Sequence, residues 1–479
     1  MKKVLIIFVL IFLSFSTFIF GTFLNNEPII NKAQIRSITD ISPTSLLIEK
    51  QVQEKTSQDK QVQEKTSQDN SFHHIPENVI FKEKIIKEEN LKVPNKIEHP
   101  TKVIHDCISE CTEITEPGYY ELCGDIDASY LVEYYAVCID ILSDNVEIDG
   151  KGYLMTGRIS GRPEAIRIRN RNYVSIHNVD TIFFSEVIGI FNSSNIHVYN
   201  NFFNEPGDGI MLAGRNNVIE NNTILDGFCG INVIGESNNI TNNVILKHTY
   251  GIYIYGVNNS YVFNNTVIDN RYGAIFLTHG ASNNVISDNY ITSRGQYTGI
   301  KIRFSSNNNT IKNNVIDNNY HGITISHESN YNNITNNSIK NNNRTGIILS
   351  DLVEGNNIIS NDIQNNTNGI LMDLIARSVF KNNIINRNKE NGIYCGRGTY
   401  NIFEENIVCF NNKSGDGLYT DVYNELISYT NVWVGNTCRS SFPSDLCENI
   451  CLQVTPESRK TLKPGSFDSS AFGSTTIKE

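Results

Sequence analysis

The sequence has little charge for its length, and it has no basic excess. Charged residues make up 19% of 479 residues, and 51 acidic residues outnumber 40 Lys and Arg, for a net charge of −11. A chain without a basic excess is a poor partner for nucleic acid or for an anionic bilayer. Gly-rich phosphate loops, His-Glu-x-x-His and Gly-x-Ser-x-Gly are absent as well. We therefore expect no nucleic-acid partner, no metal and no cofactor.

Long apolar runs are also scarce, but one at the start of the chain is nearly long enough to span a bilayer. Lys2 and Lys3 precede an apolar stretch from Val4 to Phe20, the order of a secretory signal. The small residues of a cleavage site are poorly placed, and a stretch of about 20 apolar residues can also span a membrane. Residues 1–24 are thus predicted to be a signal peptide or an N-terminal membrane anchor. The remainder is expected outside the cytoplasm, in the periplasm, on the cell surface or secreted.

Residues 25–105 lack the apolar and aromatic content that a folded core needs. The segment Gln51–Asp59 is repeated identically as Gln61–Asp69, in a region rich in Lys, Glu, Gln, Ser and Asn. Such a composition buries too little apolar surface to offset the loss of chain entropy on folding. We expect a disordered linker here, and a second disordered segment after Leu452.

Ten cysteines suit an exported chain, where disulfides form and persist. Close cysteine pairs also resemble zinc-ligand spacing, but they stand too far apart in the chain for one local zinc module. We expect disulfides at the two ends of the main body, and Cys395 and Cys409 are plausible partners of each other. The candidate disulfide cysteines are Cys107, Cys111, Cys123, Cys138, Cys395, Cys409, Cys438, Cys447 and Cys451.

Helical periodicity is absent, which excludes leucine-rich and α-solenoid repeats. Instead, a Gly-Ile step or a close variant recurs at intervals of 20 to 26 residues. The glycines of this step are Gly189, Gly209, Gly230, Gly251, Gly273, Gly299, Gly322, Gly346, Gly369, Gly392 and Gly417. Around each step the apolar residues alternate, as in Gly230-Ile231-Asn232-Val233, which indicates a short strand with one buried face.

A repeat of this length, made of short strands and tight turns, fits one coil of a parallel β-helix. Asn pairs such as Asn313-Asn314 recur between the steps. Asn tolerates left-handed corners, and stacked amides can form a ladder along the axis. We predict an all-β, right-handed parallel β-helix of roughly 12–13 coils with Cys-rich caps. Its parts are an N-terminal cap with irregular coils at 106–164, repeats at 165–437, and a C-terminal cap with its tail at 438–479.

The start of the repeat region and its repeating units resemble those of a known protein family. The segment Ile114–Asp149, "ITEPGYYELCGDI … VCIDILSDNVEIDGKG", leads into units of the form "GI … SNNITNNVI". This resembles the parallel β-helix repeat family that includes the β-helix domain of NosD-type periplasmic proteins and many archaeal and bacterial surface proteins. The resemblance covers about Thr112 to Thr437 and implies the fold. It does not imply the maturation role of NosD, because the chain has no copper-binding Met/His cluster.

Outward residues of a β-helix form columns, with one residue from each coil. Aligning the Gly-Ile steps places an aromatic and cationic group on one surface across four coils. Its members are Tyr250, Tyr253, Tyr255, Tyr272, Phe276, Lys301, Arg303 and His321. Aromatic faces suit sugar rings, and Lys or Arg can hold a uronate carboxylate. Stacked aromatic side chains also stabilise sheets without any ligand. In this alignment Asp208 stands alone between Ile188 and Cys229, which leaves no second carboxylate for a hydrolytic pair.

Two functions follow from this surface. The first is a non-catalytic cell-surface or periplasmic protein that binds glycan or other envelope components. The second is a polysaccharide lyase, epimerase or hydrolase, with Lys301, Arg303, His321 and Asp208 as candidate catalytic residues. The ligand-binding candidates are Tyr250, Tyr253, Tyr255, Tyr272, Phe276, Lys301 and Arg303.

Overall fold

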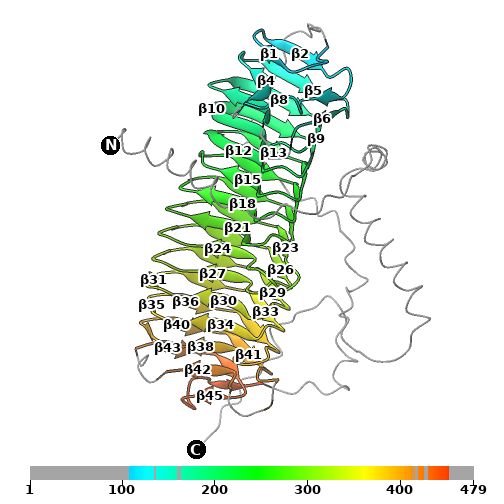
Figure 1. Ribbon diagram of the computed structural model, residues 1–479. Helices are drawn as coiled ribbons and strands as arrows, with labels where there is room; N and C mark the ends of the chain where they lie inside the picture. Colours follow the sequence, from blue (N-terminus) through cyan, green and yellow to red (C-terminus); the bar gives the residue numbers. More distant parts are fainter. Residues whose placement is uncertain are drawn as a thin grey trace, which may run out of the picture. The chain divides into compact units, whose positions relative to one another are not determined.

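The computed structural model describes residues 107–133, 136–158, 163–413, 415, 419–425 and 430–451. The predicted signal or anchor, the linker at 25–105 and the tail after Leu452 lie outside these residues. Within them the chain forms strands joined by turns, stacked along one axis (Figure 1). In this described part, no helix has the length and apolarity to cross a membrane.

Each turn of the described chain except the last contributes a strand to each of three faces, which we call the first, second and third face in chain order. The first and second faces form one 28-stranded sheet, because β10 runs from one face onto the other. The strands of the first face are β1 (Thr112–Ile114), β4 (Val137–Ile141), β7 (Glu164–Arg169), β10 (Glu186–Tyr199), β12 (Asp208–Arg215), β15 (Cys229–Val233), β18 (Tyr250–Tyr255), β21 (Gly273–Thr278), β24 (Ile300–Ile302), β27 (Ile323–Ile325), β30 (Thr345–Leu349), β34 (Asn368–Met372), β38 (Ile393–Cys395), β42 (Val422–Asn424) and β45 (Ser441–Phe442).

The second face continues β10 and adds β2 (Gly118–Glu121), β5 (Val146–Asp149), β8 (Asn172–His177), β13 (Val218–Glu220), β16 (Asn239–Thr241), β19 (Tyr261–Phe263), β22 (Val285–Ser287), β25 (Thr310–Lys312), β28 (Asn333–Thr335), β32 (Asn357–Ile359), β36 (Val379–Lys381), β40 (Ile402–Glu404) and β43 (Val432–Val434). A small three-stranded sheet lies between the first and second faces and consists of β31 (Val353–Glu354), β35 (Ile375–Ala376) and β39 (Gly398–Thr399).

The third face is a 15-stranded sheet with one strand from each turn. Its strands are β3 (Ile126–Asp127), β6 (Leu154–Thr156), β9 (Asp180–Ile182), β11 (Phe202–Asn204), β14 (Thr223–Leu225), β17 (Val244–Leu246), β20 (Thr266–Ile268), β23 (Tyr290–Thr292), β26 (Val315–Asp317), β29 (Ser338–Lys340), β33 (Asp362–Gln364), β37 (Ile384–Asn386), β41 (Ile407–Cys409), β44 (Thr437–Cys438) and β46 (Asn449–Ile450). The predicted parallel β-helix is confirmed. It has slightly more turns than expected, because the cap regions add turns of their own.

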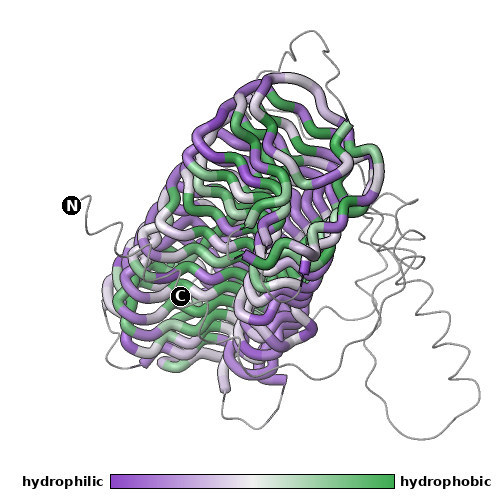
Figure 2. Tube along the Cα trace, turned by 45° about the horizontal axis from the view of Figure 1, so that its top comes forward, coloured by the Kyte–Doolittle hydropathy of each residue, from purple (hydrophilic) through white to green (hydrophobic). Residues whose placement is uncertain are grey.

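The strands of successive turns pair in parallel, and apart from a shift in β10 between Phe191 and Ser194 the pairings keep their register, so like residues mostly lie over like residues. Ile231 pairs with Ile252, and Ile252 pairs with Ile275. These side chains are fully buried, as are their counterparts from Ile139 to Val422. The turns lie over one another in Figure 2, with hydrophobic positions following one another along the stack. The alternation read from the sequence therefore builds a continuous core of aliphatic side chains.

The two residues of each recurring Asn pair have different structural roles. The first residue, such as Asn313 (φ 57°), is exposed and turns the corner in the left-handed conformation. The second, such as Asn314, is buried, and its amide nitrogen donates to the amide oxygen of Asn337 in the next turn at 3.0 Å. One unbroken ladder with steps of 2.9–3.0 Å consists of Asn201, Asn222, Asn243, Asn265, Asn289, Asn314, Asn337, Asn361, Asn383, Asn406 and Asn436. The predicted asparagine ladder is confirmed.

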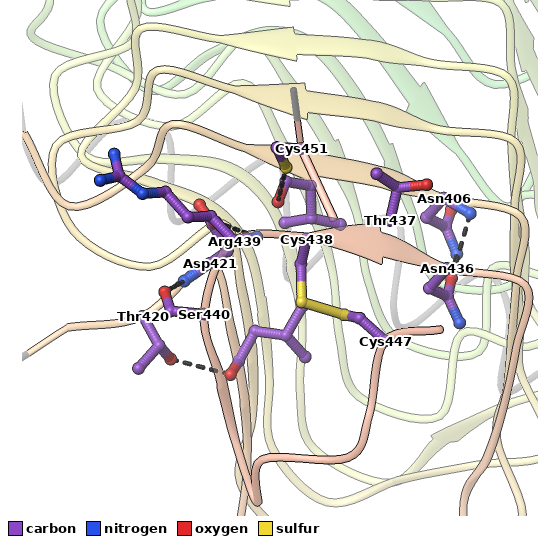
Figure 3. The surroundings of a disulfide bond; sticks show 12 residues. Asn406, Thr420, Asp421, Asn436, Thr437, Cys438, Arg439, Ser440, Cys447 and Cys451 are labelled. Atoms are coloured by element: carbon purple, nitrogen blue, oxygen red, sulfur yellow. Dashed lines mark hydrogen bonds between the residues drawn. A yellow bond between two sulfur atoms is a disulfide. The ribbon is translucent and has the colours of Figure 1, made fainter. Parts of the chain in front are cut away.

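Disulfides tie down both ends of the described solenoid. Cys107 is bonded to Cys123 and Cys111 to Cys138 at the N-terminal end. At the other end the bonds join Cys438 to Cys447, drawn in Figure 3, and Cys409 to Cys451. The disulfides thus cross-link the terminal turns of the stack, whose outermost strands pair with a neighbour on one side only.

The predicted pairing of Cys395 with Cys409 is wrong, because Cys409 is bonded to Cys451 and the buried Cys395 is in none of the disulfides of the described part. The two cysteines lie on different faces of the solenoid. Cys395 is in β38 of the first face and points into the core, whereas Cys409 is in β41 of the third face. In β41 the inward position is Val408, so the side chain of Cys409 points outward, where Cys451 reaches it.

The asparagine ladder predicts a large loss of stability for Asn314→Leu. This change removes the side-chain oxygen that accepts hydrogen bonds from the backbone N–H and the side-chain amide of Asn289. It also removes the amide nitrogen that donates to Asn337. Buried groups left unpaired cost about 1–3 kcal/mol each, so we expect a loss of about 3–5 kcal/mol in a urea titration. The matched control is Asn313→Gly at the neighbouring exposed corner, where glycine adopts the same backbone conformation at a cost of about 1 kcal/mol or less. Equal losses for the two variants would contradict a special role for the ladder.

Candidate functional site

Four aromatic rings on the outer side of the first face are in mutual contact. The ring of Tyr250 lies 5.0 Å from that of Tyr253 and 5.2 Å from that of Tyr272. The ring of Phe276 lies 5.5 Å from Tyr253 and 5.9 Å from Tyr272. They come from β18, β21 and the turn before β21, so two adjacent turns form the cluster. Phe276 is buried beneath the others, whereas Tyr272 is 43% exposed.

Lys301 extends this cluster by one turn. Its β24 backbone pairs with Phe276, its side-chain carbons run past Gly273, and its Nζ lies 3.9 Å from the centre of the Tyr272 ring. Burial, and then the charge of Arg303, lower the pKa of Lys301 to about 8. Within the described residues, no carboxylate lies within 4.0 Å of this ammonium group. Lys301 is therefore a partly desolvated cation with aromatic neighbours and, in the described part of the chain, no carboxylate partner.

His321 flanks Lys301 in the following turn. Its Nδ1 accepts a hydrogen bond from the backbone N–H of Thr345 at 3.3 Å, so the neutral ring carries its proton on Nε2. Burial, together with Arg344 and Lys301, lowers the pKa of His321 to about 4. At neutral pH the side chain is therefore a hydrogen-bond donor with no free basic nitrogen. We call Tyr250, Tyr253, Tyr272, Phe276, Lys301 and His321 the aromatic–cationic patch.

Two of the predicted residues turn away from this patch toward the corner between the first and second faces. Tyr255 stacks on His279 with ring centres 4.6 Å apart. Arg303 lies over the ring of Phe304 at 4.9 Å, and its Nη2 is 3.2 Å from Nε2 of His327. A second row of rings, which the sequence reasoning missed, runs from Tyr255 through His279 and Phe304 to His327. The signal was present in the sequence, as an aromatic or His residue at or just after the end of the Gly-Ile strand in these four turns.

Asp208 does not stand alone, and that prediction is wrong. β10 pairs Glu186 with Asp208 and, on its other side, with Glu164. Val187 occupies the position that Gly209 holds in the next turn, so Gly189 lies opposite Met211 and not opposite Gly209. Similarly, the inserted Ala274 places Gly273, and not Tyr272, opposite Tyr250. The overlooked signal was an acidic residue two positions before an Ile at 164, 186 and 208, a constant spacing of 22 residues.

These three carboxyl groups lie in the same column as Cys229 and Tyr250, on the side of the patch toward the N-terminal cap. Burial raises the pKa of Glu186 well above its ordinary value, and the neighbouring Glu164 and Asp208 add to the effect. The absence of a side chain at Gly189 leaves room for this carboxyl group, because a Cβ there would lie 2.2 Å from its Oε1. Glu186 is thus held protonated under conditions in which an exposed Glu is charged.

This raised pKa predicts a pH-dependent stability. Above about pH 4.5 the unfolded chain loses a proton that folded Glu186 keeps, so stability falls as the pH rises toward the folded-state pKa. Glu186→Gln resembles the protonated carboxyl group and should flatten the fall between about pH 5 and about pH 8. Thermal unfolding of the variant, the wild type and the exposed control Glu113→Gln at both pH values measures this. A fall of unchanged size in Glu186→Gln would contradict the assignment.

Comparison with known proteins identifies the fold of the region that carries the patch. Residues 229–373 match the family model described as right handed beta helix region. These turns are therefore right-handed β-helix repeats, as predicted, while the NosD-type subfamily stays a prediction. No curated protein matches the sequence.

Three solved structures are similar in fold at low identity. The periplasmic alginate epimerase AlgG is 15% identical over 68% of this chain and 77% of its own, with a TM-score of 0.42. The A-module of the mannuronan C-5 epimerase AlgE4 of Azotobacter vinelandii is 13% identical over 70% and 89%, with a TM-score of 0.46. The tailspike of E. coli bacteriophage HK620, solved with a pentasaccharide, is 11% identical over 71% and 66%, with a TM-score of 0.47. These likenesses carry no function over to this chain.

Proposed function

We propose that this chain is an exported β-helix protein that binds an acidic, uronate-containing polysaccharide at the aromatic–cationic patch without cleaving it. The observation that carries the proposal is the ammonium group of Lys301, which is partly desolvated and has no carboxylate within 4.0 Å in the described part. Keeping a cation in such a place costs stability, and a bound anion would relieve that cost.

The groups around Lys301 suit a sugar that carries a carboxylate. Tyr272 is exposed beside it and offers a ring face for the C–H side of a pyranose. The Nε2–H of His321 can donate to a hydroxyl or carboxylate oxygen. The patch also runs along the solenoid axis, so successive turns meet successive units of a linear polymer. Disulfides at both ends support export, and the predicted leader and linker would hold the solenoid at the cell envelope.

The absence of catalysis is part of the proposal. A lyase or epimerase needs a base at the sugar, and the acceptor nitrogen of His321 is already engaged by Thr345. Lys301, with a pKa of about 8, is mainly protonated at neutral pH. Neither side chain therefore offers an available base in this state.

A second candidate function, glycan hydrolysis, is favoured by one observation. Glu186 and Asp208 are in-register neighbours on the face that carries the patch, and the pKa of Glu186 is raised. Adjacent carboxyl groups with unequal pKa values are what a glycoside hydrolase uses as acid and nucleophile or base. A polymer lying along the axis over Tyr250 would also pass Asp208, two turns away, and Glu186, three turns away.

The charge on Lys301 predicts a pH-dependent affinity. Raising the pH through about 8 deprotonates Lys301, so binding to a polyuronate should weaken there. Lys301→Arg, which stays charged, should bind on both sides of that pH. Lys301→Ala should lose about tenfold to a hundredfold in affinity at neutral pH, the size of one charge-assisted hydrogen bond. Isothermal titration calorimetry with a polyuronate measures all three. Equal affinity of the wild type and Lys301→Ala would overturn the proposal.

A product assay separates binding from turnover. Purified protein is incubated with a panel of uronate and neutral polysaccharides, and unsaturated products and new reducing ends are measured. We expect neither, with a commercial lyase as the positive control. Turnover lost in Glu186→Gln or Asp208→Asn would establish the hydrolytic candidate, and unsaturated product lost in Lys301→Ala would establish a lyase.

A further inference from the structure

A groove follows the corner between the first and second faces, next to the patch. One section has a volume of about 790 Å³ and is lined by residues from His279 to Leu374. The adjoining section has a volume of about 520 Å³ and is lined by residues from Leu352 to Thr399, so that Leu352 and Leu374 belong to both. Between the turns of His279 and Arg397 there are five steps of the stack, a length of about 24 Å.

The floor of this groove is apolar and open to solvent. Leu352 is 64% exposed, Phe304 38% and Leu374 37%. All three have left-handed backbone conformations, with φ values of 64°, 55° and 57°. For a residue with a bulky side chain this conformation is unfavourable, and one turn before Phe304 the same corner includes Gly280 at φ 83°. The chain therefore carries strained leucines where they add little burial, which points to a role outside stability.

The arginines beside Leu352 and Leu374 differ from Lys301 of the patch, because each is paired with a carboxylate. Arg377 is paired with Glu354 at 2.5 Å, and Arg397 donates to Asp373 at 2.5 and 2.7 Å. Asp351 lies 3.4 Å from Nδ1 of His327. Of the described residues that line the section from Leu352 to Thr399, Arg397 is the one cation and it is paired with Asp373, so an additional carboxylate is not what this section selects.

We propose that this groove binds O-acetylated sugar units of the same polysaccharide, with the acetyl methyl groups against Leu352 and Leu374. A bare hydroxyl against these leucines would lose its hydrogen bonds to water, whereas an acetyl methyl gains from the contact. The hydroxyls of Ser305 and Thr399 line the two sections and can donate to the ester carbonyl. This proposal rests on the proposed function. Tyr255 links the two regions, with its ring 6.2 Å from Tyr253 in the patch and 4.6 Å from His279 in the groove.

The test compares one polyuronate in two forms, partly O-acetylated and the same sample after mild alkaline deacetylation. The full-length wild type should bind the acetylated form about threefold to tenfold more tightly, as expected for one or two buried methyl groups. Leu352→Asn and Leu374→Asn should abolish this preference. Since Asn tolerates the left-handed conformation, their unfolding temperatures should stay the same or rise. Tyr173→Asn, at an exposed left-handed position on β8 of the second face, is the matched control and should keep the preference.

The outcomes separate this inference from the proposed function. Equal binding of both polymers by the wild type, still dependent on Lys301, overturns the groove inference and leaves the patch in place. Loss of folding stability together with loss of binding to both polymers in the Asn variants also overturns it, because the leucines would then be structural. If the wild type binds neither polymer, both proposals fail.

Discussion

Every feature of this molecule depends on the hydrogen bonds that join each turn to the next in register. They run through the parallel strands of all three faces and through the amide ladder from Asn201 to Asn436. Because a strand shifted by one residue would exchange its buried and exposed side chains, the ladder and the aliphatic core enforce the same alignment. That alignment creates the outward columns, so the surface chemistry is a direct product of the stacking.

The fold could be predicted because its signals are local and repeated many times. A Gly-Ile step, period-two alternation and Asn pairs each have a simple physical reason, and a single irregular turn does not hide the pattern. The error at Gly189 shows the limit of this approach. The glycine was matched by residue type, whereas β10 continues without a break and sets its register by its inward Ile188 and Ile190.

The candidate site could be predicted only in part. The columns placed Tyr250, Tyr253, Phe276 and Lys301 correctly, since they depend on register alone. Where each side chain turns depends on its neighbours, so the swing of Arg303 toward His327 was not predictable. The groove was also missed, because corners vary in length from turn to turn and have no fixed period. Disulfide pairing failed at Cys395 for a related reason: proximity in sequence does not tell which face a side chain occupies.

The covalent bonds at the two ends have a consequence for how such a stack comes apart. A solenoid in which each turn contacts only its neighbours loses order most easily at its terminal turns. Here those turns are bonded by Cys107–Cys123 and Cys111–Cys138 at one end and by Cys409–Cys451 and Cys438–Cys447 at the other. A reducing environment would therefore fray the molecule from both extremities toward its middle, and the turns that carry Tyr250 and Lys301 would be among the last to melt.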